Sequence, residues 1–107
     1  MVKNTKYLFQ VIWGKRYVGV ALDIKLRKNI KYPITTFFFW PNDNGWELLN
    51  NQLSIKPYLP EEDKIEILNN YNKIINYWVY NVEKIDDITI LMKDSIKYNF
   101  EICCIDF

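Results

Sequence analysis

One segment constrains the fold of this chain more than any other, because its pattern is that of a long amphipathic helix. Pro60 suits the first position of a helix, and the acidic side chains of residues 61–63 complement the positive helix end. Apolar side chains then recur at i, i+3 and i+7 as Ile65, Leu68, Tyr71, Ile75, Trp78 and Val82, opposite a polar face. We therefore expect one helix over residues 60–82 that covers a sheet with its apolar face.

The residues before this helix predict that sheet. Residues 7–13 and 17–24 are rich in β-branched and aromatic side chains, and residues 14–16 between them suit the tight turn of a hairpin. Residues 35–40 predict a third, buried strand, which Pro41 ends. The hairpin and this strand would form a small sheet.

A shorter helix is predicted to follow the third strand. Asn44 and Glu47 have the spacing of a capping box, and Trp46, Leu49 and Leu53 recur at helical spacing. Lys56 and Pro57 end the pattern after roughly three turns. Together with the helix over residues 60–82, it gives two helices to cover the sheet.

The C-terminal part of the sequence favours β structure. Residues 88–92 predict a strand, and residues 96–104 alternate between apolar and polar side chains, which is typical of a half-buried strand. The predicted fold class is α+β: an N-terminal hairpin and a third strand form a small sheet, covered by two helices, with a C-terminal strand extension. Residues 1–82 would be the core, and residues 83–107 a β extension of the same single domain.

The residue inventory argues against catalysis. The chain of 107 residues contains no histidine, which excludes His-based triads and His-metal sites. Cys103 and Cys104 are adjacent, so they cannot build a disulfide framework and leave a zinc site two ligands short. Most carboxylates lie at a helix start or a turn, where local structure explains them. We expect no catalytic residue, no metal and no cofactor.

The apolar runs are too short for a membrane protein. The longest uninterrupted one covers residues 37–40, whereas a membrane-spanning helix needs about 20 apolar residues. We expect a soluble intracellular protein with neither a membrane partner nor a small-molecule substrate.

Charge is nearly balanced, with 14 Lys and Arg against 13 Asp and Glu, so RNA binding would depend on local patches. Two such patches are predicted, the turn of the hairpin and a basic loop over residues 25–33. The candidate RNA-binding residues are Lys15, Arg16, Lys25, Arg27, Lys28 and Lys31. Asn, Ile, Lys and Tyr fill 47 of the 107 positions, and their A/T-rich codons favour an organelle genome.

The aromatic residues are assigned mainly to the core. The predicted core residues are Phe37, Phe39, Trp40, Trp46, Ile75 and Trp78. Three tryptophans, Trp40, Trp46 and Trp78, are expected to meet between sheet and helices. The alternative for the aromatic run at residues 37–40 is stacking on RNA bases. It is less favoured because this run predicts a buried strand rather than an exposed platform.

Five motifs follow one another in residues 38–78: Phe-Phe-Trp-Pro, Trp-Glu-x-Leu, Ser-x-Lys-Pro-aromatic, Leu-Asn and Ile-Ile-Asn-x-Trp. In this order and spacing they resemble the plastid-specific ribosomal protein 3 family, and residues 19–23 resemble its Gly-x-Ala-Leu-Asp segment. The chain departs from the family pattern at three positions. Asn42 stands where an arginine is expected, Gly45 where alanine is expected, and Tyr58 where tryptophan is usual.

The resemblance implies a non-catalytic component of a chloroplast-type small ribosomal subunit, located in the plastid stroma. Its implied partners are the ribosomal RNA of that subunit and neighbouring ribosomal proteins. The residues leave open a second class of function, a soluble protein-binding adaptor whose aromatic groove accepts a peptide or a helix. An adaptor would not depend on RNA, whereas a ribosomal protein would.

Overall fold

The structure is a computed structural model that describes residues 6–27, 30–84 and 88–106. Its elements are β1 (Tyr7–Gly14), β2 (Val18–Arg27), β3 (Ile30–Pro33), β4 (Phe38–Trp40), α1 (Gly45–Ser54), α2 (Glu61–Asn81), α3 (Ile88–Lys97) and β5 (Phe100–Asp106). The predicted α+β class and the N-terminal hairpin are confirmed. The two predicted helices correspond to α1 and α2, and α3 is a third helix.

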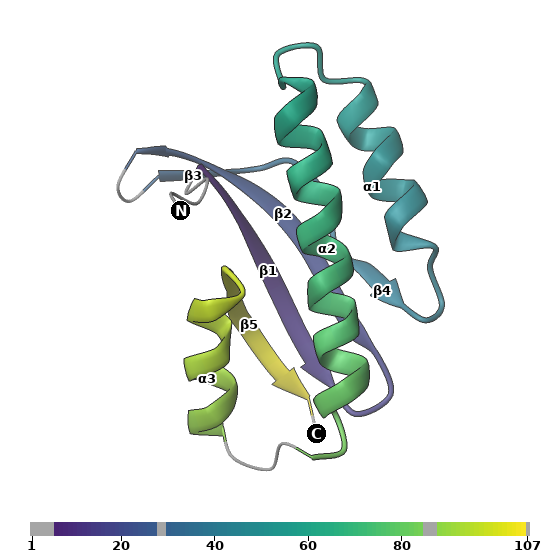
Figure 1. Ribbon diagram of the computed structural model, residues 1–107, viewed down its shortest axis with the longest axis vertical. Helices are drawn as coiled ribbons and strands as arrows, with labels where there is room; N and C mark the ends of the chain where they lie inside the picture. The colour runs from purple at the N-terminus through teal and green to yellow at the C-terminus, as the bar shows by residue number, and fades with distance from the viewer. Residues whose placement is uncertain (1–5, 28–29, 85–87, 107) are drawn as a thin grey trace.

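A curled sheet forms the centre of the molecule (Figure 1), with the strand order β3-β2-β1-β5 and β4 paired to β2. Strands β1 and β2 are antiparallel, with Trp13 opposite Val18 at the hairpin end. Strand β5 runs parallel to β1, with Phe100 opposite Phe9, and therefore extends the sheet as predicted for the C-terminal strand.

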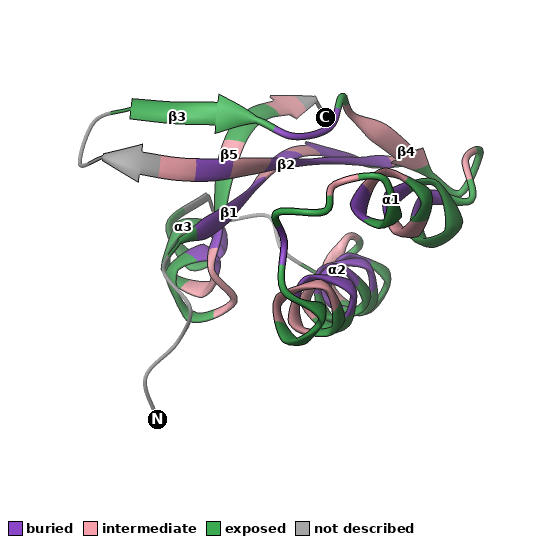
Figure 2. Cartoon of the chain, turned by 90° about the horizontal axis from the view of Figure 1, so that it is seen from above, coloured by how far each residue is buried: buried purple, intermediate pink, exposed green. Residues whose placement is uncertain are grey.

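All three helices lie on one face of the sheet, as Figure 2 shows. Because side chains alternate along a strand, that face receives Tyr7, Phe9, Val11 and Trp13 from β1, and all four are buried in the core. Alternate residues of β2, from Val18 to Ile24, join them. The opposite face, called the outer face below, carries no helix among the described elements.

Helix α1 begins where its capping residues predict. The side chain of Asn44 accepts a hydrogen bond from the backbone N–H of Glu47 at 3.3 Å, and its amide group donates to the Glu47 carboxylate at 3.0 Å. Leu49 and Leu53 are buried against the core. The N-cap hydrogen bond from the Glu47 backbone to Asn44 therefore fixes the start of α1, and the buried leucines fix its orientation.

Helix α2 buries the face that includes Leu68, Tyr71, Ile75 and Trp78, as its periodicity predicts. Ile65 is the exception, since it is 58% exposed one turn after the helix begins. The hydroxyl of Tyr7 donates to the Asp63 carboxylate at 2.7 Å and so ties the first turn of α2 to the start of β1. Among the described residues, no helix has the length and apolar character needed to cross a membrane.

The segment after α2 differs from its prediction. The strand expected at residues 88–92 was wrong, because this stretch begins α3, whose Leu91 and Ser95 lie one helical turn apart and are both buried. The strand expected from residue 96 instead begins at Phe100. Between them, Asn99 adopts a left-handed conformation with φ of 59°, which Asn tolerates better than most residues. The division of the chain at residue 82 stays a prediction.

The tryptophans do not meet as expected. Ile75 and Trp78 are buried, but Trp40 is 36% and Trp46 42% exposed, so their placement in the core was wrong. Trp40 ends the three-residue strand β4 at the side of the sheet, and Trp46 lies in the first turn of α1, one turn before Leu49, where the core does not cover it. Phe37 and Phe39 are half-buried. The fully buried tryptophan is Trp13, which packs edge-on against Tyr77 at 5.7 Å.

Gly45, the first residue of α1, makes room for Tyr71 of α2. A Cβ atom at position 45 would overlap the Tyr71 hydroxyl and come within 2.8 Å of its ring carbon Cζ. That hydroxyl is buried without a hydrogen-bond partner among the described residues, and burial raises the pKa of Tyr71 to about 12. The close approach explains why glycine stands where alanine would favour the helix more.

We expect Gly45→Ala to destabilise the protein, although alanine normally favours a helix over glycine by about 1 kcal/mol. Overpacking should dominate and lower the free energy of unfolding by roughly 1 to 3 kcal/mol, measured by urea denaturation. Tyr71→Phe removes the hydroxyl, so Gly45→Ala should cost much less in that background. A Gly45→Ala protein as stable as the parent would contradict this packing.

Candidate nucleic-acid interface

The hairpin turn between β1 and β2 carries Lys15 and Arg16 at its tip. The backbone N–H of Gly14 donates to the carbonyl of Tyr17 at 3.0 Å and closes the turn. The indole Nε1 of Trp78 donates to the carbonyl of Gly14 at 2.9 Å in a buried hydrogen bond. The turn is therefore fixed against α2, and the two cations project from a rigid support.

Both tip cations are available to a partner. Lys15 and Arg16 are exposed, and neither forms an ion pair within the part of the chain that the structure describes. The tip lies at the end of the sheet beside the C-terminal end of α2 (Figure 1). Because these cations are exposed, they can contact a phosphate, and the fold contains no unpaired buried charge at this turn.

The other predicted cations lie elsewhere. The basic loop expected over residues 25–33 was wrong, because Lys25 and Arg27 belong to β2 and Lys31 to β3. Lys28 lies outside the described residues. Lys25 lies seven residues after Val18, the first residue of β2, which is about 23 Å along the strand away from the tip at ~3.3 Å per residue. The candidates that the structure describes therefore do not form one patch.

Lys31 is also partly neutralised. Its ammonium group lies 3.0 and 3.2 Å from the two carboxylate oxygens of Glu101 on β5. Nearby on the outer face, the amide of Gln10 donates to the Asp23 carboxylate at 3.1 Å. Polar side chains thus already engage one another across this part of the outer face.

Half-buried aromatic rings occupy the outer face near the tip. Phe39 lies over Gly19, where a Cβ atom would come within 2.6 Å of its ring, and Tyr17 similarly covers Gly14. The Phe39 ring centroid is 5.7 Å from that of Tyr17 and 6.3 Å from that of Phe37. Tyr17, Phe37 and Phe39 form an aromatic cluster beside the tip cations. Sequence reasoning missed this cluster because it assigned Phe37 and Phe39 to the core.

The described residues hold no group of three His, Cys, Asp or Glu side chains that could bind a metal. Cys103 and Cys104 are exposed free thiols on β5. The Tyr7 and Tyr77 hydroxyls have a raised pKa, caused first by burial and then by their hydrogen bonds to Asp63 and Asp94. These are contacts between elements of the fold, and they keep both hydroxyls protonated.

Known proteins are similar to this chain over most of its length. Residues 34–81 match the model of the plastid and cyanobacterial ribosomal protein family (PSRP-3 / Ycf65). The small ribosomal subunit protein cS23 of Gracilaria tenuistipitata var. liui is 35% identical over 74 residues, which are 69% of this chain and 74% of that protein. The chain belongs to the PSRP-3/Ycf65 family.

Other relatives agree with this membership. The probable small ribosomal subunit protein cS23 of Synechococcus sp. (strain JA-3-3Ab) is 38% identical over 73 residues, or 68% of this chain and 73% of that protein. The small ribosomal subunit protein cS23 of Cyanidium caldarium is 34% identical over 80 residues, or 75% of this chain and 78% of that protein. The predicted family resemblance is confirmed. PSRP-3/Ycf65 proteins are structural components of the ribosome and not enzymes, which confirms the expected absence of catalysis.

The support of the hairpin tip can be tested with two tryptophan variants. Trp78→Phe leaves the buried Gly14 carbonyl without its donor, so we expect the free energy of unfolding in urea to fall by roughly 1 to 3 kcal/mol. Trp46→Phe is the matched control, because Trp46 is 42% exposed and should change stability by no more than about 0.5 kcal/mol. Equal midpoints for the two variants would show that the indole hydrogen bond does not hold the tip.

Proposed function

We propose that this chain is a non-catalytic structural component of the small ribosomal subunit of a plastid and works in the chloroplast stroma. The observation that carries the proposal is the similarity to proteins named as small ribosomal subunit proteins, over about three quarters of their length. Its partners would be the ribosomal RNA of that subunit and neighbouring ribosomal proteins. The balanced charge favours a peripheral position with few phosphate contacts.

The main RNA contact is assigned to Lys15 and Arg16. Their exposure, the absence of an ion pair within the described residues and the buried hydrogen bond behind the turn all support this assignment. Cations of this kind bind phosphates and fix position rather than read bases. Lys25, Arg27 and Lys31 would form a second, weaker contact toward the other end of β2, where Glu101 competes for Lys31. Lys28 stays a predicted RNA-binding residue outside the described residues.

Contacts with neighbouring proteins are assigned to exposed apolar side chains on the α1 side of the molecule. Trp46, Leu48, Ile55 and Tyr58 are each at least 39% exposed on α1 and in the loop that follows it. Apolar side chains that gather on a surface are typical of protein interfaces. Burial of these side chains against a neighbouring protein would add to the free energy of binding, to which the few cations contribute little.

The RNA contact predicts a change in salt dependence. Lys15→Ala/Arg16→Ala should weaken association with small subunits in sedimentation experiments. It should also reduce the slope of log K against log salt by about 2, since each phosphate contact contributes roughly 0.9. Folding should be unaffected, because exposed charges outside caps shift stability by about 0.5 kcal/mol or less.

Lys56→Ala/Lys93→Ala is the matched control, because it removes the same charge from α3 and the loop between α1 and α2. If both double variants have the same salt slope, the tip is not the main RNA contact.

Sedimentation after ribonuclease treatment separates the proposal from a protein-binding adaptor. An adaptor would keep its partner without RNA, and a ribosomal component would be released from the subunit.

A further inference from the structure

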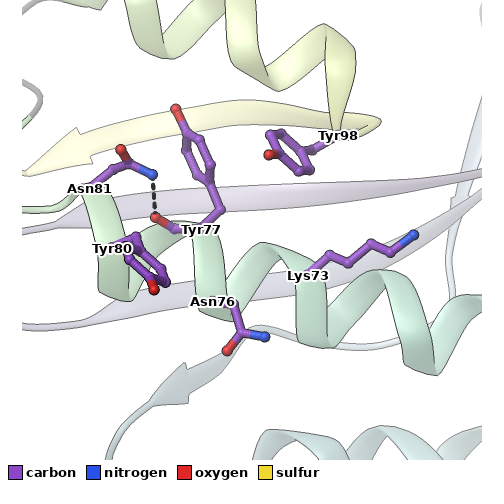
Figure 3. A pocket seen from close by; sticks show the side chains of 6 residues that line it. All are labelled: Lys73, Asn76, Tyr77, Tyr80, Asn81 and Tyr98. Carbon is purple, nitrogen blue, oxygen red and sulfur yellow. Dashed lines mark hydrogen bonds between the residues drawn. The ribbon is translucent and has the colours of Figure 1, made fainter.

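A groove of about 290 Å³ lies between the C-terminal half of α2 and the turn that joins α3 to β5 (Figure 3). Its six lining residues are Lys73, Asn76, Tyr77, Tyr80, Asn81 and Tyr98. Three are aromatic, two are amides and one is a cation. None is acidic, so the groove favours a ligand that is aromatic and carries negative charge.

Tyr77 makes the inner wall of this groove rigid. Its hydroxyl donates to the Asp94 carboxylate at 2.6 Å, which joins α2 to α3. Its ring centroid lies 4.9 Å from that of Tyr98, and its backbone carbonyl accepts a hydrogen bond from the Asn81 amide at 2.8 Å. The wall therefore exists before any ligand binds, which lowers the entropy cost of binding.

The outer part of the groove leaves an aromatic ring uncovered. Tyr80 is 72% exposed, and the ammonium group of Lys84 lies 5.6 Å from its ring centroid. On the other side, the ammonium group of Lys97 lies 5.5 Å from the Tyr98 ring centroid. Rings flanked by lysines offer a stacking surface together with positive charge, the combination that binds single-stranded nucleic acid.

We infer that this groove binds one unpaired nucleotide of an RNA strand, with its base stacked on the exposed ring of Tyr80 and its phosphate near Lys73. The Asn76 side chain is exposed and can face a base edge. The side-chain amide of Asn81 donates to the backbone carbonyl of Tyr77 through its nitrogen, so its side-chain oxygen can accept a hydrogen bond from the base. The inference deepens the proposed function and rests on it, since it adds a second kind of RNA contact to the phosphate contacts of the tip.

The groove and the tip are joined through α2. The indole of Trp78 donates a hydrogen bond to the Gly14 carbonyl at the tip, and the preceding residues of α2, Asn76 and Tyr77, line the groove. Both features therefore lie toward the C-terminal end of α2 (Figure 1). One RNA element with a paired stem and an unpaired base could contact both.

Binding of the full chain to a short labelled single-stranded RNA, and to a duplex of the same length, tests the inference by fluorescence anisotropy. Tyr80→Ala should weaken binding of the single strand by about 5- to 100-fold, the usual effect of losing one stacked base, and leave duplex binding unchanged. Tyr58→Ala is the matched control, because Tyr58 is a comparably exposed tyrosine outside the groove, at 62%, and the contacts assigned to it are with proteins, which this assay does not contain. It should bind both RNAs as the parent does.

The inference is overturned if the two tyrosine variants bind the single strand alike, if Tyr80→Ala loses duplex binding in the same proportion, or if the parent does not bind the single strand. A Tyr80→Ala protein with normal RNA binding but weaker association with subunits would mean that the groove holds a protein segment instead. Failure of the proposed function has a different signature: the parent chain would not sediment with small subunits at all.

Discussion

Strand β1 lies between β2 and β5, and the helices pack against the face that it shares with them. Tyr7 binds the first turn of α2 through Asp63, and Trp13 packs on Tyr77 in the same helix six residues further along β1. Phe9 faces Phe100 across the parallel pair. The alternation of side chains on this one strand thus decides which face is covered and which remains open to a partner.

Local signals in the sequence are sufficient for the hairpin, α1 and α2, and insufficient for α3. Capping, turn chemistry and a long helical period are properties of neighbouring residues, so they can be recognised without the fold. The start of α3 is rich in β-branched residues, which favours a strand. Burial of Leu91 and Ser95, one helical turn apart, selects the helix instead, and α3 acquires a buried face only once it packs against β5.

The candidate interface was predictable only in part, for a related reason. Lys15 and Arg16 are exposed because any tight hairpin turn projects from its sheet. Residues 30–33 suggest a loop because β3 is a short edge strand with all four residues exposed, and its Lys31 and Pro33 are typical of loops and sheet edges alike. Once these residues are strands, Lys25 and Lys31 lie far from the tip. The exposed positions of Trp40 and Trp46 likewise depend on packing that no local pattern contains.

The parallel pairing of β1 with β5 joins segments about 90 residues apart, with Phe9 opposite Phe100. The hairpin of β1 and β2 can form early during synthesis, but the second edge of β1 stays unpaired until β5 has left the ribosome. At usual rates of elongation this interval is roughly 5 to 20 seconds. During that time the nascent chain exposes a strand edge and the apolar groups that Phe100 later covers, and an unpaired strand edge favours pairing with other chains.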